Sequence, residues 1–267
     1  MIRITNIKKN LGGKQVLKGI SLDVHKGEKL VVIGRSGCGK SVLLKHMVGL
    51  MQPDSGTVEV YKQDLSGLGE TGLAAIRLKI GFLFQGAALF DSMTVGENVS
   101  LPLIENFSFT QREIARKVEE KLELVGLPGI QRLKPSELSG GMRKRVGLAR
   151  AIITEPEVIF YDEPTTGLDP IMSDAIDNLV NSLAERLQVT SVVVTHDMDS
   201  VKKVADRVIM LHEGHIFFDD APDRLFQSDN HVVRNFVNRS SVDDDEIVHE
   251  MEDLAVKAGQ PDSTKPR

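Results

Sequence analysis

The 267-residue chain contains a single cysteine, Cys38, and no tryptophan, and its aromatic residues amount to only 4%. With one thiol, no disulfide can form within the chain, which excludes a disulfide-stabilised secreted scaffold. The scarcity of aromatic side chains argues against a nucleic-acid-binding surface on which bases stack, and we expect no nucleic-acid partner. A chain of this length can bury a core that is stable without metal clips.

Long apolar runs are also missing. No run approaches the roughly 18 apolar residues that a membrane-spanning helix needs, and residues 1–10 are charged and lack the apolar stretch of a secretory signal. We therefore expect a soluble chain that is not exported and does not itself cross a membrane.

Net charge of one sign is confined to one end of the chain. The formal net charge is −5, and residues 240–267 account for all of it with eight acidic and three basic residues. A neutral body with an acidic tail argues against electrostatic capture of DNA, RNA or anionic lipid. We interpret residues 1–239 as the main domain and 240–267 as an acidic C-terminal extension, either a solvated terminus or an arm that binds a partner.

Short runs rich in β-branched and apolar residues predict strands, several of them apolar throughout. Strands buried on both faces belong to a sheet covered by helices, so we expect an α/β fold with a parallel core. Between residues 94 and 154 helical signals replace them, including a capping box that opens a helix over 111–125, and we predict an α-helical insert at about 86–153. The predicted strands cover residues 2–7, 20–24, 29–33, 57–60, 80–84, 158–161, 191–194 and 207–211.

A glycine-rich segment lies between the strand predicted at 29–33 and an apolar-rich helix predicted at 42–50, and it fits the pattern G-x-x-x-x-G-K-[ST]. In such a loop the backbone N–H groups surround phosphate oxygens, the lysine adds a positive charge, and the serine hydroxyl can bind Mg²⁺. We predict ATP or another nucleoside triphosphate with Mg²⁺ as the ligand, and we interpret Cys38 as a small residue that fills the loop. The predicted nucleotide-binding residues here are Gly34, Arg35, Ser36, Gly37, Cys38, Gly39, Lys40, Ser41 and Val42.

Two acidic residues, Asp162 and Glu163, follow the apolar strand predicted at 158–161. In a doubly wound sheet, such strand ends face the bound ligand. Asp162 suits the outer coordination shell of Mg²⁺, and Glu163 suits a water molecule, as a general base or a polarising group. His196 follows the next apolar strand and can donate a hydrogen bond to a γ-phosphate. We expect Glu163, His196 and Lys40 to be the catalytic residues.

Another motif, Leu138-Ser139-Gly140-Gly141-Met142, opens a basic helix, and Ser139 precedes Asp162 by 23 residues. With this motif the chain resembles the ATPases of ABC transporters, because the family's segments occur in the family's order. The glycine-rich loop matches the P-loop, Gln85 the Q-loop, residues 138–141 the LSGG signature, Asp169 the D-loop and His196 the switch histidine.

The resemblance implies a P-loop NTPase (RecA-like) core with an α-helical insert subdomain and a small N-terminal antiparallel β portion. It further implies that Gln85 binds nucleotide and metal, with Ser41 and Asp162 as the other metal-binding residues. Nucleotide contacts are implied for Ser139, Gly140, Gly141 and Asp169.

Two glycines after Ser139 at a helix N-terminus make a second anion site, distant from the first within one subunit. In the family, two subunits enclose two ATP molecules, with the P-loop of one facing the LSGG of the other, so a two-fold homodimer is implied. The chain departs from the family at Leu11, where an aromatic side chain commonly stacks on adenine. We therefore expect weak discrimination between ATP and GTP.

Residues 84–99, at the entry to the helical insert, and Met142 followed by Lys144 and Arg145 are similar to the MlaF-like subclass. This resemblance implies phospholipid transport with a separate membrane permease docked on the insert and an Mce-domain protein. It implies a cytoplasmic subunit peripheral to the inner membrane, whose C-terminal extension reaches the partner subunit.

The alternatives are the ATPase of an amino-acid or metal importer, an ABC ATPase of DNA repair or translation, and a P-loop kinase or GTPase. The repair and translation proteins usually carry a coiled-coil insertion, a second cassette or a zinc module, and one cysteine in 267 residues fits none of these. Kinases and GTPases should lack both LSGG and the switch histidine.

Overall fold

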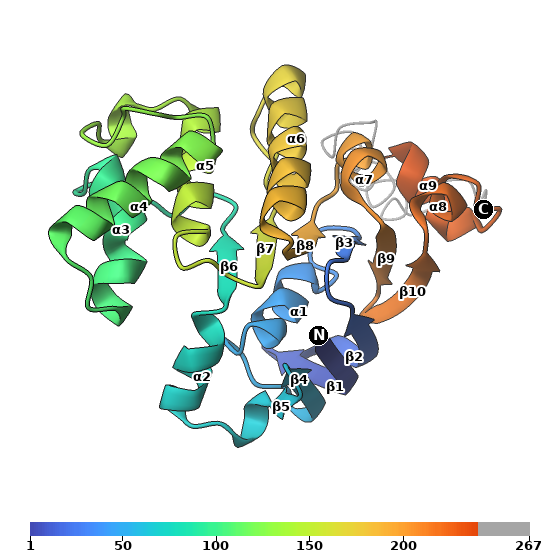
Figure 1. Cartoon of the computed structure of the whole chain (residues 1–267). Helices are drawn as coiled ribbons and strands as arrows, with labels where there is room; N and C mark the ends of the chain where they lie inside the picture. The colour runs from blue at the N-terminus through green and yellow to red at the C-terminus, as the bar shows by residue number, and fades with distance from the viewer. Residues whose placement is uncertain (240–267) are drawn as a thin grey trace, which may run out of the picture.

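Two β-sheets form the framework of residues 1–239, the part of the chain that this computed structural model describes (Figure 1). Residues 240–267, the predicted acidic extension, lie outside the described residues. The strands are β1 (Ile2–Leu11), β2 (Lys14–Val24), β3 (Lys29–Ile33), β4 (Ser55–Val60), β5 (Gln63–Asp64), β6 (Ile80–Leu83), β7 (Val158–Asp162), β8 (Thr190–Val194), β9 (Arg207–His212) and β10 (His215–Asp220).

The smaller sheet is antiparallel, with the strand order β2-β1-β4-β5. The larger sheet has the order β10-β9-β3-β8-β7-β6. Its strands are parallel except for β10, which pairs with β9 in the antiparallel sense. The predicted α/β fold with a parallel core and an antiparallel N-terminal portion is therefore confirmed.

The helices gather around the larger sheet, with α3, α4 and α5 together beyond β6, and α8 and α9 beside β9 and β10 at the opposite edge (Figure 1). In the described residues no strand lies between β6 and β7. The helices are α1 (Lys40–Met47), α2 (Glu70–Arg77), α3 (Val95–Asn106), α4 (Gln111–Leu124), α5 (Gly140–Ala151), α6 (Pro170–Leu187), α7 (Met198–Val204), α8 (Pro222–Phe226) and α9 (His231–Arg239).

Some element boundaries differ from the prediction. Strand β2 begins at Lys14 rather than at residue 20, because pairing with β1 extends into a stretch where lysines and glycine hide the strand signal. Helix α1 begins at Lys40 and ends at Met47, since Gly49 adopts the left-handed conformation that stops a helix. Strand β10 was not predicted, because it is a half-exposed edge strand without a continuous apolar run.

The larger sheet lies between two hydrophobic cores. Leu30 and Val32 of β3 face the core shared with α1 and the antiparallel sheet. Val31 and Ile33 face the core shared with α3, α4, α5, α6 and α7. Because side chains alternate along a strand, β3 contributes to both cores and is apolar throughout.

Helix α5 lies unusually close to β6. A Cβ atom added to Gly81 of β6 would stand 2.6 Å from the backbone oxygen of Ala151, at the end of α5. One added to Gly147 of α5 would stand 3.0 Å from Leu83 Cδ1 and 3.1 Å from Ala87 Cβ. The two glycines therefore allow the backbone of α5 to approach the edge of the sheet.

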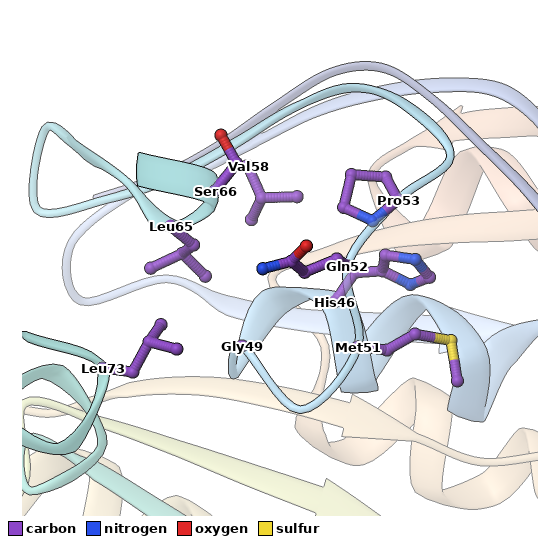
Figure 2. A pocket seen from close by; sticks show the side chains of 9 residues that line it. All are labelled: His46, Gly49, Met51, Gln52, Pro53, Val58, Leu65, Ser66 and Leu73. Atoms are coloured by element: carbon purple, nitrogen blue, oxygen red, sulfur yellow. The ribbon is translucent and has the colours of Figure 1, made fainter. Parts of the chain in front are cut away.

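A small cavity at the C-terminal end of α1 is lined by a buried histidine (Figure 2). The cavity volume is about 10 Å³, room for one water molecule at most, so it is not a ligand site. His46 is fully buried, and its Nδ1–H donates to the backbone oxygen of Val42 at 2.7 Å. Burial lowers the pKa of His46, outweighing the opposite effect of the Val42 carbonyl.

We expect acidification from about pH 7.5 to about pH 5.5 to destabilise the fold partly through His46. The unfolded side chain binds a proton near its ordinary pKa of about 6.5, whereas the buried one resists it. The stabilisation is therefore present above that pH and is lost below it, by at most about 1.4 kcal/mol per pH unit. Thermal unfolding at the two pH values should show that acidification destabilises His46→Leu less than it destabilises the wild type.

The matched control is His215→Leu, since His215 is exposed on β10. This variant should follow the wild type across the pH range. Equal pH dependence of His46→Leu and the wild type would contradict the assignment.

Candidate functional site

Four segments that carry predicted site residues follow the C-terminal ends of parallel strands, on the same side of the larger sheet. Strands β3, β8, β7 and β6 are neighbours in that order. Val194 of β8 is level with Val32 of β3 and with Asp162 of β7, and Leu83 of β6 is level with Tyr161. The glycine-rich loop, His196, Glu163 and Gln85 therefore follow adjacent strand ends, where parallel sheets bind ligands.

The glycine-rich loop is closely enclosed by its neighbours. Gly34 and Gly39 both have positive φ angles, 149° and 108°. A Cβ atom on Gly34 would lie 2.5 Å from the Leu211 backbone oxygen, and one on Gly39 would lie 2.9 Å from Leu17 Cδ2. Glycine is thus required at both positions. Helix α1 starts directly after the loop without a side-chain N-cap, which leaves its first N–H groups for an anion.

Lys40 and Cys38 have different environments within this loop. Lys40 Nζ donates to the backbone oxygens of Gly34 at 2.6 Å and Arg35 at 3.2 Å, so the loop holds the ammonium group. Burial raises the pKa of the Cys38 thiol, and this outweighs the opposing charge of Lys40. A neutral, half-buried thiol favours the interpretation of Cys38 as a packing residue rather than a nucleophile.

Asp162 and Ser41 supply oxygen atoms on adjoining segments. Burial raises the pKa of Asp162, and the charge of Glu163 raises it further, while Lys40 and a hydrogen bond from Ser41 oppose these effects. The Ser41 hydroxyl therefore lies near the Asp162 carboxylate. Oxygen donors beside a carboxylate that is costly to ionise fit a small hard cation such as Mg²⁺. Gln85 is exposed, and within residues 1–239 no hydrogen bond links its side chain to this pair.

Glu163 is fixed by two side chains. Its side chain is 13% exposed, with Oε2 lying 2.8 Å from His196 Nδ1 and accepting a hydrogen bond from Thr166 Oγ1 at 2.9 Å. Burial alone raises the pKa of Glu163, but His196, Thr166 and Lys40 together lower it below its usual value. Glu163 also has a φ of 51°, a strained conformation that costs about 1–3 kcal/mol and concentrates at functional sites. The carboxylate is thus ionised, oriented and able to accept a proton.

Ser139 and Asp169 form a second cluster, at two helix N-termini. Ser139 Oγ accepts from the Met142 N–H at 3.3 Å and caps α5, while Asp169 Oδ1 accepts from the Met172 N–H at 2.9 Å and caps α6. Met172 also packs over Gly141, so a Cβ atom there would require the methionine side chain to shift. In the described residues no hydrogen bond or ion pair joins residues 139–141 or Asp169 to the glycine-rich loop.

Sequence reasoning missed two residues at this site. Thr166 holds Glu163, and nothing in its residue type indicates that contact. Lys144 of α5 is only 6% exposed and donates to the backbone oxygens of Gln85 and Glu163. The available signal was its place on the apolar face of α5, four residues before the buried Leu148.

Leu11 stands where the family commonly has an aromatic side chain, and the structure shows its surroundings. Leu11 ends β1 with 39% of its surface exposed. Val16 of β2 lies against the glycine-rich loop, with Cγ1 3.1 Å from a Cβ atom on Gly39. Apolar aliphatic groups therefore border the loop, and weak discrimination between ATP and GTP stays a prediction.

Of the helices in residues 1–239, none is both long and apolar enough to span a membrane.

Comparison with known proteins identifies the family of this arrangement. The family model described as "ABC transporter" matches residues 17–166. The protein TRIGALACTOSYLDIACYLGLYCEROL 3, chloroplastic, of Arabidopsis thaliana is 39% identical over 257 residues, covering 90% of this chain and 74% of its own length. The probable ribonucleotide transport ATP-binding protein mkl of Mycobacterium leprae is 38% identical over 89% of this chain and 68% of its own length. The methionine import ATP-binding protein MetN of Campylobacter jejuni is 36% identical over 90% of this chain and 76% of its own length.

A solved ATP-binding cassette also shares this fold. It is 33% identical, with a TM-score of 0.77, and the match covers 83% of this chain and 99% of the cassette. That structure is a dimer in a post-hydrolysis state, bound to ADP and Pi.

Proposed function

The chain belongs to the ABC transporter family as an ATP-hydrolysing subunit, and from this premise we propose that it powers the transport of phospholipid between membranes. Residues 84–99 and Met142 resemble the MlaF-like subclass. A relative that is 39% identical bears the name of a diacylglycerol lipid. That relative is the observation that carries the choice of a diacylglycerol lipid over other cargo. The likeness to the MlaF-like subclass narrows the proposed lipid to phospholipid.

The hydrolytic step is assigned to the residues at the strand ends. The N–H groups of the glycine-rich loop and Lys40 hold the ATP phosphates. Mg²⁺ held by Ser41, Asp162 and Gln85 would neutralise phosphate charge. Glu163 accepts a proton from a water molecule, and the oxygen of that water attacks the γ-phosphorus of ATP. The bond between the γ-phosphorus and the bridging oxygen of the β-phosphate breaks, which releases ADP and phosphate. His196, 2.8 Å from Glu163, donates a hydrogen bond to the γ-phosphate.

We propose that the second cluster, around Ser139 and Asp169, contacts a partner subunit in a homodimer. Residues 139–141 and Asp169 face the nucleotide bound to the other copy, so each ATP lies between two subunits. Ile171, next to the Asp169 cap, supports an interface here because it is 81% exposed, more than any other large apolar side chain of residues 1–239. A related cassette is dimeric when it holds ADP and Pi.

A groove beside the helical insert is assigned to an integral-membrane permease. It has a volume of about 550 Å³ between α2, β6 and α3, and its lining includes Phe82, Phe84, Phe90 and Leu101. Phe84 is 41% and Phe90 50% exposed, an apolar surface that a partner helix could cover. In this proposal the chain works on the cytoplasmic face of the inner membrane, held there by its partner.

We expect Phe90→Asp to abolish co-purification with the permease while leaving the ATPase activity of the isolated chain within about twofold of the wild type. A carboxylate in the groove must be desolvated when an apolar partner binds, and this cost is several kcal/mol. Pull-down of the permease measures the effect. Phe217→Asp is the control, since Phe217 is 41% exposed on β10, at the other edge of the sheet. Undiminished binding by Phe90→Asp would contradict the docking site.

Reconstitution tests the cargo. The chain is co-purified with its permease and Mce-domain partner, placed in vesicles, and assayed for ATP-dependent transfer of labelled phospholipid to acceptor vesicles. Transfer that stops with Glu163→Gln supports the proposal. The methionine import relative supports the alternative, an amino-acid importer. ATPase stimulation by methionine without phospholipid transfer would establish that alternative.

A further inference from the structure

A buried lysine of α5 connects two separate parts of the site. Lys144 Nζ donates to the backbone oxygen of Glu163 at 3.1 Å and to that of Gln85 at a shorter distance. Glu163 follows β7 and Gln85 follows β6, whereas Lys144 belongs to the helix that Ser139 caps. One side chain therefore joins the signature helix, the Q-loop and the backbone of the candidate base.

The surroundings of Lys144 show why a cation is stable there. The residue is 6% exposed, and a buried ammonium group is costly unless it is paired and hydrogen-bonded. Burial lowers the pKa of Lys144, and the charges of Glu163 and Asp162 only partly oppose this. Two carbonyl oxygens accept hydrogen bonds from the ammonium group and offset part of the cost of burial. In the described residues the ammonium group thus bonds to backbone oxygens and forms no ion pair with either carboxylate.

A second cation of α5 shows what is particular to Lys144. Arg150 donates to the backbone oxygens of Ala87 at 2.7 Å and Ala88 at 2.8 Å. The segment after Gln85 therefore remains attached to α5 without Lys144. Among the hydrogen bonds of the described residues, those of Lys144 alone join α5 to Glu163.

Glu163 needs such support because its backbone is strained. Its φ of 51° lies in the left-handed region, which a residue with a side chain seldom adopts unless its surroundings impose it. The Glu163 N–H donates to Val194 O at 2.9 Å, and the carbonyl accepts from Lys144. The backbone of the candidate base is therefore held from both sides.

We propose that Lys144 is a positioning residue for ATP hydrolysis, which fixes the backbone of Glu163 relative to the signature helix. The proposal rests on the proposed role of Glu163 as the base. Lys144 touches neither ATP nor water in this role, so its removal should impair the chemical step and leave nucleotide binding intact.

The test measures kcat and KM for ATP with the full chain. Lys144→Met, which keeps length and apolar bulk, should lower kcat roughly 10- to 100-fold with KM for ATP within about twofold. Lys144→Arg, which restores a cation and donors, should recover at least about a third of the lost activity on a logarithmic scale. Lys144→Gln, neutral but still a donor, should lower kcat at least about fivefold and replaces the methionine variant if that does not fold.

The matched control is Lys121→Met in the helical insert. Lys121 is also a buried lysine, 7% exposed, and its partner is Glu155 at 3.4 Å, away from the site. This variant should retain kcat within about twofold. The double variant Lys144→Met/Glu163→Gln should have the same residual turnover as Glu163→Gln alone, because Lys144 acts through Glu163.

The outcomes separate the two proposals. Wild-type kcat in Lys144→Met, a loss no larger than that of Lys121→Met, or a further loss in the Glu163→Gln background would overturn the positioning role. Normal turnover of Glu163→Gln would overturn the proposed role of Glu163 instead. A kcat loss that Lys144→Arg restores, together with no further loss in the double variant, supports the positioning role.

Discussion

Glu163→Gln should bind ATP as well as the wild type and hydrolyse it at least about 100-fold more slowly. The amide has nearly the shape of the carboxylate and can still accept the hydrogen bond from Thr166, but it cannot take a proton from water. Since ATP would remain intact between two subunits, the variant should also form a long-lived dimer. Phosphate release and size-exclusion chromatography with ATP measure the two effects.

The matched control is Glu157→Gln. Glu157 directly precedes β7, is 44% exposed and pairs with Lys79 at 3.1 Å on the surface. An exposed ion pair contributes about 1 kcal/mol at most, so turnover should be unchanged. Full turnover in Glu163→Gln would refute the role of Glu163, and loss of nucleotide binding would show that its carboxylate serves the fold instead.

Ser139→Arg should lose at least about 100-fold in turnover and lose ATP-dependent dimerisation, while each subunit still binds nucleotide within about threefold of the wild-type affinity. The reason is geometric, because within residues 1–239 no hydrogen bond or ion pair links Ser139 to the glycine-rich loop of its own subunit. Its proposed contact is with the nucleotide on the partner, where a long side chain would obstruct the approach. Fluorescent-nucleotide titration and light scattering separate binding from dimerisation.

Thr110→Arg is the control for this experiment. Thr110 caps α4 through the Glu113 N–H at 3.3 Å, as Ser139 caps α5, so both variants lose a helix cap worth about 1 kcal/mol. Thr110 is outside the proposed interface, and its variant should keep both turnover and dimerisation. If Ser139→Arg dimerised normally with ATP, the enclosed arrangement of the nucleotide would be wrong.

The parallel core could be predicted because its central strands are continuous apolar runs in the sequence. The central strands β3, β7 and β8 are buried along almost their whole length, so their sequences are apolar runs bounded by turns. The edge strand β10 alternates exposed and half-buried positions, and the first part of β2 is mostly exposed. At these edges pairing decides the structure, and the residue pattern contains little of that information.

The candidate site divides in a similar way. The glycine-rich loop, Asp162, Glu163 and His196 could be proposed from the sequence because each follows an apolar strand within a few residues. Lys144 and Thr166 were missed, since their contacts depend on how distant segments meet. Lys144 binds backbone oxygens, which every residue possesses, so its partners leave no mark in the sequence.

The close approach of α5 to β6 has a mechanical consequence. At Gly81 and Gly147 the two elements meet with almost no side chain between them, so this contact cannot be compressed or easily displaced. Helices α3 and α4 pack most extensively against α5 and against each other. A domain movement driven by nucleotide would therefore swing the outer helices about a pivot at this contact, with little change in the separation of Ala151 and Gly81.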